Sequence, residues 1–99
     1  MIESTLRSAY PELFFFIDRG ECGLDYSPRF REFSLMVRPK SNVFQQLIFC
    51  PFSGKPLPAS LRDPFFDMLE TLGFVNGIAD VEKAPEEFQS EAWWLSRGL

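Results

Sequence analysis

Two stretches in which apolar and polar residues alternate, separated by a turn, predict a β-hairpin at about residues 33–49. Phe33, Leu35 and Val37 occupy every second position, which places them on one side of a half-buried strand. A proline-containing turn at residues 39–42 breaks the pattern, and an extended apolar pattern resumes after it. The sequence therefore predicts a small antiparallel sheet.

A stripe of apolar residues at helical spacing predicts a helix at about residues 60–72. Gly73 supplies the stop signal that is typical of the position just beyond a helix. The stripe consists of Phe65, Met68, Leu69 and Leu72. Phe66 lies off the stripe, so it either widens the buried face or stands on the surface as a partner contact.

The start of this helix admits two interpretations. Ser60 with Asp63 has the spacing of a capping box, whereas Asp63 followed by Pro64 has the pattern of an N-cap with proline in the first turn. We expect one irregular turn at residues 60–63 and a regular helix after it, because Pro64 lacks an N–H.

The N-terminal pattern predicts a short helix at residues 3–10 that ends at Pro11. The apolar run Leu13–Ile17 is short and rich in aromatic residues, which favours a buried strand. The alternative is a helix that continues from residue 3 with a kink at Pro11.

A helical tail is predicted at the C-terminus, where Pro85 precedes two acidic residues. Adjacent tryptophans on a helix point about 100° apart, so Trp93 and Trp94 cannot both face one core. We expect one of them to be partly exposed or to cover the edge of a groove. The compatible alternative is a tail that packs over the sheet.

Composition predicts one domain, residues 1–99, because 99 residues cannot hold two independent cores. Hydrophobic residues make up 45% of the chain, so disorder is not expected. There are 12 phenylalanines, some of them surplus to a small core, and a surplus of aromatic side chains marks a partner surface.

The net charge of −4 is concentrated in one segment, residues 76–91. Five acidic residues lie there beside Lys83 as the sole basic residue: Asp80, Glu82, Glu86, Glu87 and Glu91. An acidic patch repels phosphate backbones, so a basic protein is the better electrostatic partner. A solvated acidic loop without a partner is the alternative.

The chain holds two cysteines, Cys22 and Cys50, and no histidine. Catalytic triads and histidine-based metal sites are therefore excluded, and structural zinc would lack ligands. No signal peptide opens the sequence and no apolar run is long enough to span a bilayer, so we expect a cytoplasmic protein with reduced thiols.

A zinc-knuckle pattern, C-P-x-C-G-x-x-L-P, is present with its second cysteine replaced by Ser53. It spans Cys50-Pro51-Phe52-Ser53-Gly54-Lys55-Pro56-Leu57-Pro58 and directly follows the predicted hairpin. A serine hydroxyl is a poor zinc ligand, so we expect a knuckle-like turn at residues 50–58 without metal or other cofactor.

This knuckle belongs to a longer pattern, C-P-F-S-G-K-P-L-P-A-S-L-R-D-P-F-F-D-M-L-E, and the tail reads P-E-E-F-Q-S-E-A-W-W. Both segments resemble a family of small bacterial and phage proteins of unknown function. The resemblance covers about residues 25–94 and implies a degenerate zinc-ribbon-like α+β fold. It implies no activity, and residues 1–21 lack the cysteines that complete a zinc site in typical members.

Two further sets of residues are candidates for chemistry or binding. Asp63 and Asp67 have the spacing of a carboxylate pair on one helix face, but a cap and a solvated residue are the favoured roles. Four basic residues are candidate contacts for a nucleic-acid accessory protein that has lost its metal: Arg29, Arg31, Lys55 and Arg62.

The leading hypothesis is a non-enzymatic, acidic protein-binding module, of the kind found among inhibitors and immunity proteins. Homo-oligomerisation is compatible with it, and membrane association is not expected. The expected partner-binding residues are Phe66, Glu86, Glu87, Glu91, Trp93 and Trp94.

Overall fold

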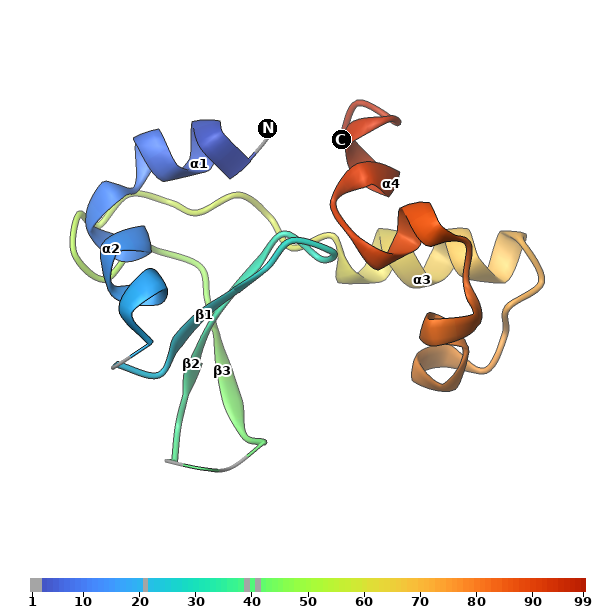
Figure 1. Ribbon diagram of the computed structural model, residues 1–99, viewed down its shortest axis with the longest axis horizontal. Coiled ribbons are helices and arrows are strands. Elements are labelled where there is room, and N and C mark those ends of the chain that lie inside the picture. Colours follow the sequence, from blue (N-terminus) through green and yellow to red (C-terminus); the bar gives the residue numbers. More distant parts are fainter. Residues whose placement is uncertain (1–2, 21, 39, 41) are drawn as a thin grey trace.

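The computed structural model describes residues 3–20, 22–38, 40 and 42–99. Two helices precede a small antiparallel sheet and further helices follow it along the chain, which confirms the mixed α+β class (Figure 1). In chain order the elements are α1 (Glu3–Ala9), α2 (Pro11–Arg19), β1 (Leu24–Ser27), β2 (Glu32–Met36), β3 (Phe44–Leu47), α3 (Arg62–Thr71), the 3₁₀-helices η1 (Gly77–Lys83) and η2 (Glu86–Gln89), and α4 (Ala92–Leu95).

The sheet has the strand order β1-β2-β3, and both pairs are antiparallel. Strands β2 and β3 form the predicted hairpin. The pattern analysis missed β1, although Leu24 and Tyr26 alternate with polar residues, because a strand of four residues between Gly23 and Pro28 is a weak signal. Residues 39 and 41 of the predicted turn lie outside the described part of the chain.

The interpretation of Leu13–Ile17 as a strand is wrong. The residues are helical, as in the alternative, but two separate helices meet at Tyr10, whose φ is −131°, in place of one helix kinked at Pro11. These residues form the middle of α2, which begins at Pro11 and ends at Arg19; the next residue, Gly20, is left-handed with φ 68°. Proline suits the first helical turn because the N–H that it lacks has no partner there. The helix buries Leu13 and Phe14 and leaves Phe15 exposed.

Helices α1 and α2 cover one face of the sheet, and no helix formed by the described residues covers the opposite face (Figure 1). The apolar residues of the covered face enter a cluster that we call the sheet core. Its buried members are Leu6, Tyr10, Leu13, Phe14, Tyr26, Phe33, Cys50 and Leu57.

A second cluster, the tail core, is built by α3 and the segments that follow it. Its buried members are Phe30, Leu61, Phe65, Leu69, Val81, Ala84, Phe88, Trp93 and Trp94. Phe30 is contributed by the β1–β2 turn, which therefore joins the two cores. Because the cores lie side by side, the molecule is elongated, with extents of 40 × 31 × 19 Å.

The expectation that one tryptophan would be exposed is wrong, since Trp93 and Trp94 are both fully buried. Contacts with the β1–β2 turn explain why both rings are buried, which the geometry of an isolated helix does not predict. The indole N–H of Trp93 donates to the carbonyl of Arg29, and that of Trp94 donates to the carbonyl of Pro28, each at 2.7 Å. A turn lying across α4 thus buries both rings and satisfies both N–H groups.

Helix α3 begins at Arg62 and has no side-chain cap, so neither interpretation of its start is correct. The hydroxyl of Ser60 accepts a hydrogen bond from the Arg62 N–H at 3.2 Å. Pro64 is the third helical residue, where a missing N–H is tolerated.

The end of α3 agrees with the predicted stop. Gly73 has φ 93°, and the Phe74 N–H donates to the Leu69 carbonyl at 2.8 Å, as in a Schellman motif. Leu72, the last residue of the predicted stripe, is exposed.

Candidate functional site

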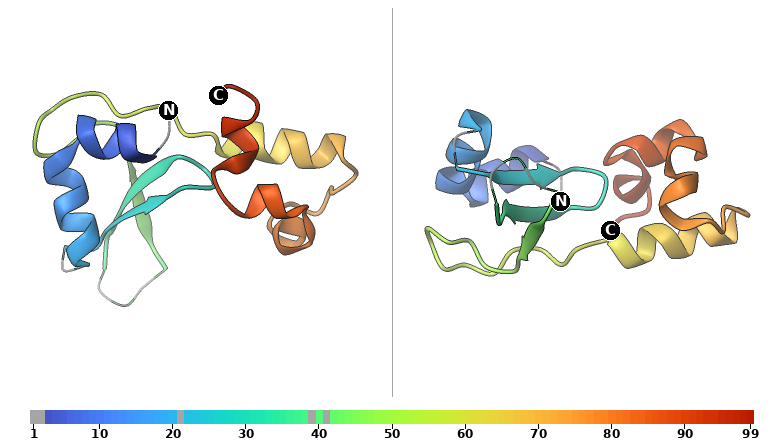
Figure 2. Two further views of the ribbon diagram at one scale, coloured as in Figure 1. Left: turned by 45° about the horizontal axis from the view of Figure 1, so that its top comes forward. Right: turned by 90° about the horizontal axis from the view of Figure 1, so that it is seen from below.

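The segment after β3 forms a tight turn, residues 50–58, which we call the knuckle. The Gly54 N–H donates to the Cys50 carbonyl at 2.8 Å, and the Cys50 N–H donates to the Lys55 carbonyl at 2.9 Å. Gly54 adopts φ 74°, which favours glycine. The chain then returns beside the end of β3, where the Leu57 N–H donates to the Ile48 carbonyl at 2.9 Å (Figure 2).

Cys50 is buried in the sheet core, and both cysteines are free. Burial raises the pKa of the Cys50 thiol, but hydrogen bonds from the Ser53 hydroxyl and from the backbone of Ser53 and Phe52 bring the pKa below its ordinary value. Within the described ranges, no three potential ligands gather in a way that could hold a metal ion.

The N-terminal helices pack against the knuckle. Cys50 and Leu57 share the sheet core with Leu13 of α2, and the Tyr10 hydroxyl donates to the Pro56 carbonyl at 2.5 Å. Packing and one long-range hydrogen bond therefore hold a turn that four metal ligands would hold in a zinc ribbon.

Three aromatic rings, two of them exposed and that of Phe16 half-buried, join α2 to the knuckle. Phe16 stacks on Phe52 with ring centroids 4.9 Å apart, and Phe15 meets Phe16 edge to face at 5.2 Å. We call these three residues the ring cluster. Phe15 and Phe52 are 55% and 48% exposed, and Ile48 and Phe49, which lead into the knuckle, are exposed as well.

The uncovered face of the sheet forms the floor of a groove of about 370 Å³. Because side chains alternate between faces, the strand register sets Asp25, Ser34 and Gln46 in one row across the three strands. The groove is lined by Asp25, Ser27, Phe30, Glu32, Ser34, Phe44, Gln46 and Arg62.

An ion pair between Glu32 and Arg62 lies in the wall of the groove. The Arg62 Nε and Nη2 atoms donate to the two carboxylate oxygens at 2.9 and 2.8 Å. The Ser60 hydroxyl donates to Glu32 Oε2 at 2.7 Å, and the Arg62 guanidinium lies 4.3 Å from the ring centroid of Phe30. The hydrogen bonds from Arg62, against the opposing effect of burial, lower the pKa of Glu32.

The expected partner-binding residues do not lie together on one surface of the protein. Trp93 and Trp94 are inside the tail core, and Phe66 is half-buried against Phe30, with centroids 6.0 Å apart. Glu86 is exposed. Glu91 is half-buried, and its Oε2 atom has no hydrogen-bond partner in the described part of the chain.

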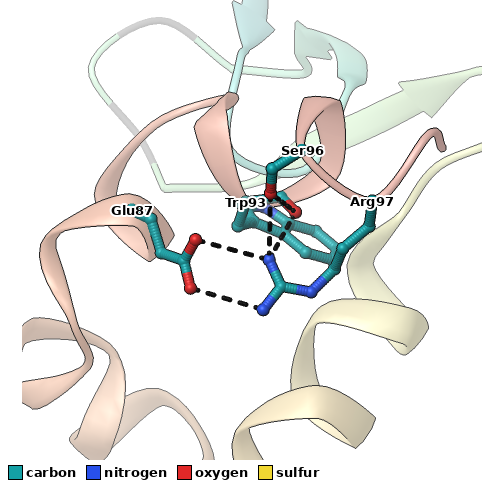
Figure 3. A network of polar contacts seen from close by, with 4 residues as sticks. All are labelled: Glu87, Trp93, Ser96 and Arg97. Atoms are coloured by element: carbon teal, nitrogen blue, oxygen red, sulfur yellow. Dashed lines mark hydrogen bonds and ion pairs between the residues drawn. The ribbon is translucent and has the colours of Figure 1, made fainter.

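Glu87 belongs to an intramolecular network that fastens the C-terminal residues (Figure 3). Arg97 Nη2 lies 3.3 Å from Glu87 Oε1, and Nη1 donates to the Trp93 carbonyl at 2.7 Å. Asp80 is likewise buried and lies 3.8 Å from the Lys83 ammonium. The charge of residues 76–91 is therefore partly neutralised within the molecule.

The basic residues expected to contact nucleic acid also bind their own chain. Arg29 donates to Gln89 Oε1 at 2.7 Å, and Arg31 donates to the Ala59 and Leu99 carbonyls at 2.8–3.1 Å. Arg62 is paired to Glu32. Of the four candidate cations, Lys55 is exposed, and its ammonium group forms no hydrogen bond or ion pair with another described residue. Asp63 and Asp67 are both exposed on α3, and Asp63 does not cap the helix.

Pattern analysis missed the groove because it missed β1. Once β1 is added, Asp25 and Ser27 fall on the same face as Ser34 and Gln46. The alternation of polar with apolar residues along the three strands is therefore the sequence signal that predicts this polar face. The ring cluster was missed because Phe15 and Phe16 were assigned to a buried strand. No helix in the described ranges is long and apolar enough to cross a bilayer.

The family described as a domain of unknown function (DUF6980) matches residues 16–96, and the chain belongs to it. This confirms the resemblance to a family of unknown function. Comparison with curated proteins and comparison with solved structures found no significant match.

Proposed function

We propose that this member of the DUF6980 family is a non-enzymatic module that binds another protein, with the ring cluster as the apolar part of its contact surface. The observation that carries the proposal is the exposure of Phe15 and Phe52, which Phe16 joins into one cluster; Ile48 and Phe49, which precede the knuckle in the sequence, are exposed as well. Aromatic residues are enriched at protein interfaces, and contiguous exposed apolar surface is unusual on a monomer.

Polar groups border the ring cluster, as expected at the rim of an interface. The Arg19 guanidinium lies 5.4 Å from the ring centroid of Phe15. Such a surface stays soluble while it is free and presents flat rings to a partner.

The net charge of −4 supports a partner with a basic surface, because opposite charge speeds association. Glu82 and Glu86 are exposed and form no ion pair with another described residue. They are better candidates for this steering than Glu87, which Arg97 neutralises.

In its narrower form, the proposal is an inhibitor or immunity-type protein that acts in the cytoplasm of a bacterium and carries a degenerate zinc-ribbon-like knuckle. The small size, the acidity and the intact turn at residues 50–58 around a single cysteine support this form. The competing hypothesis is that the same apolar surface binds a second copy of the chain and forms a homo-oligomer.

Affinity capture from a lysate of the source cells tests the proposal. The bait proteins are the wild type, a Phe15→Ser/Phe52→Ser variant, and a control Val75→Ser/Ile78→Ser variant whose apolar residues are 69% and 76% exposed in the wild type. We expect the wild type and the control to retain one stoichiometric basic protein and the ring-cluster variant to bind it at least tenfold more weakly.

Retention of the same protein by the ring-cluster variant would contradict the proposed surface. Absence of a stoichiometric partner, together with a wild-type dimer in light scattering that the ring-cluster variant dissociates, would replace it with self-association.

A further inference from the structure

The groove on the uncovered sheet face has an excess of negative charge. Of its three charged residues, Asp25 and Glu32 are acidic and Arg62 is basic. Asp25 is exposed and forms no ion pair with another residue of the described ranges, so its carboxylate is available to a ligand.

Arg62 does not make the groove a site for anions. Two of its guanidinium nitrogens donate to Glu32, and its Cζ atom lies over the Phe30 ring, 4.3 Å from the centroid. A bound anion would have to compete with a carboxylate held at 2.8 Å, so the ligand that the groove favours is a cation.

The remaining lining also suits a donor-rich, planar cation. Ser27, Ser34 and the Gln46 side-chain carbonyl can accept hydrogen bonds around Asp25. Phe44, 47% exposed, stands at the β3 edge of the groove and offers a ring face for a cation–π contact.

We propose that the groove receives an arginine side chain of the protein partner, with its guanidinium paired to Asp25 and packed against Phe44. The guanidinium is planar and forms paired hydrogen bonds with a carboxylate, which distinguishes arginine from lysine. This inference rests on the proposed function and places the direct contact with a basic side chain of the partner in the groove, whereas Glu82 and Glu86 act only on the approach of the partner.

An NMR titration of the ¹⁵N-labelled full chain tests the inference. The probe is N-acetyl-arginine methylamide, and its neutral counterpart is N-acetyl-citrulline methylamide, which has nearly the same shape. We expect saturable shifts of the amides of residues 24–27, 32–34 and 44–47, with a dissociation constant on the order of millimolar. The citrulline probe should bind about fivefold more weakly, the upper range for an exposed ion pair.

Two variants decide where the charge preference arises. Asp25→Asn should bind the two probes equally, whereas Asp67→Asn, which removes an exposed carboxylate on α3, should keep the preference for arginine. Shifts elsewhere on the chain, equal binding of both probes by the wild type, no shifts at millimolar concentrations, or an unchanged preference in Asp25→Asn would each overturn the inference.

This experiment is independent of affinity capture. If the wild type prefers arginine but captures no partner, the groove stands and the proposed function fails. If a partner is captured through the ring cluster while the titration fails, the protein-binding function stands without this groove.

Discussion

The two faces of the sheet come from the same strands but have different surroundings. On one face, Tyr26 and Phe33 are buried beneath α1 and α2. On the other, Asp25 and Ser34, their neighbours in the sequence, line an open groove. The strand alternation thus assigns one face to stability and leaves the other for binding, because a single-residue shift changes the face of every side chain.

The largest predicted difference between the faces is in stability. Phe33→Ala should lower the free energy of unfolding by about 3–5 kcal/mol, because it removes a fully buried ring and leaves a cavity. Ser34→Ala, one residue away on the open face, should change it by less than about 0.5 kcal/mol. Urea denaturation monitored by tryptophan fluorescence measures both; comparable losses would remove the distinction between the faces.

A smaller effect is expected at the end of the sheet, where the tail core holds the β1–β2 turn. Trp94→Phe removes the N–H that donates to the Pro28 carbonyl at 2.7 Å and should cost about 1–3 kcal/mol. The same denaturation experiment applies, with Ile78→Ala as an exposed control. A loss no larger than that of the control would show that the hydrogen bond does not hold the cores together.

The ion pair between Glu32 and Arg62 in the groove wall should make a pH-dependent contribution to the free energy of unfolding. Glu32→Gln should cost about 1–2 kcal/mol at pH 7, discounted because Arg62 is partly exposed. The pKa of Glu32 is lowered in the folded protein, so its contribution is complete above the pKa in the unfolded chain and is lost as the pH falls through the folded value. The difference in stability between the variant and the wild type should therefore shrink as the pH falls through the folded pKa of Glu32; a difference that stays constant as the solution is acidified would contradict the ion-pair account.

The smallest effect on stability is expected on the groove floor. Asp25→Asn should change the free energy of unfolding by less than about 0.5 kcal/mol, because the exposed carboxylate has no ion-pair partner in the described part of the chain. Thermal unfolding of Asp25→Asn beside Asp67→Asn measures this. Marked destabilisation by Asp25→Asn alone would assign Asp25 a structural role.

Local patterns predicted much of the fold. Alternation located the β2–β3 hairpin, and the apolar stripe with Gly73 located α3 and its end. The run Leu13–Ile17 was misassigned because a short apolar segment suits a buried strand or a helix equally. Pro11 and Gly20 were the boundary signals that favoured the helix.

The site could not be predicted at the same level because it depends on long-range contacts. Burial of both tryptophans requires the carbonyls of Pro28 and Arg29, more than 60 residues away. Glu87 is neutralised by an ion pair with Arg97, ten residues further along the chain. The groove forms because β1 pairs with β2. Helical geometry and charge counts along the sequence contain none of these pairings.

Amide hydrogen exchange of the wild type with and without its captured partner tests the central claim most directly. The account predicts slower exchange on binding in residues 44–54, because Phe44 and Gln46 of the edge strand β3 line the groove and Phe52 of the knuckle belongs to the ring cluster. Slower exchange confined to residues 76–91, with residues 44–54 unchanged, would contradict it.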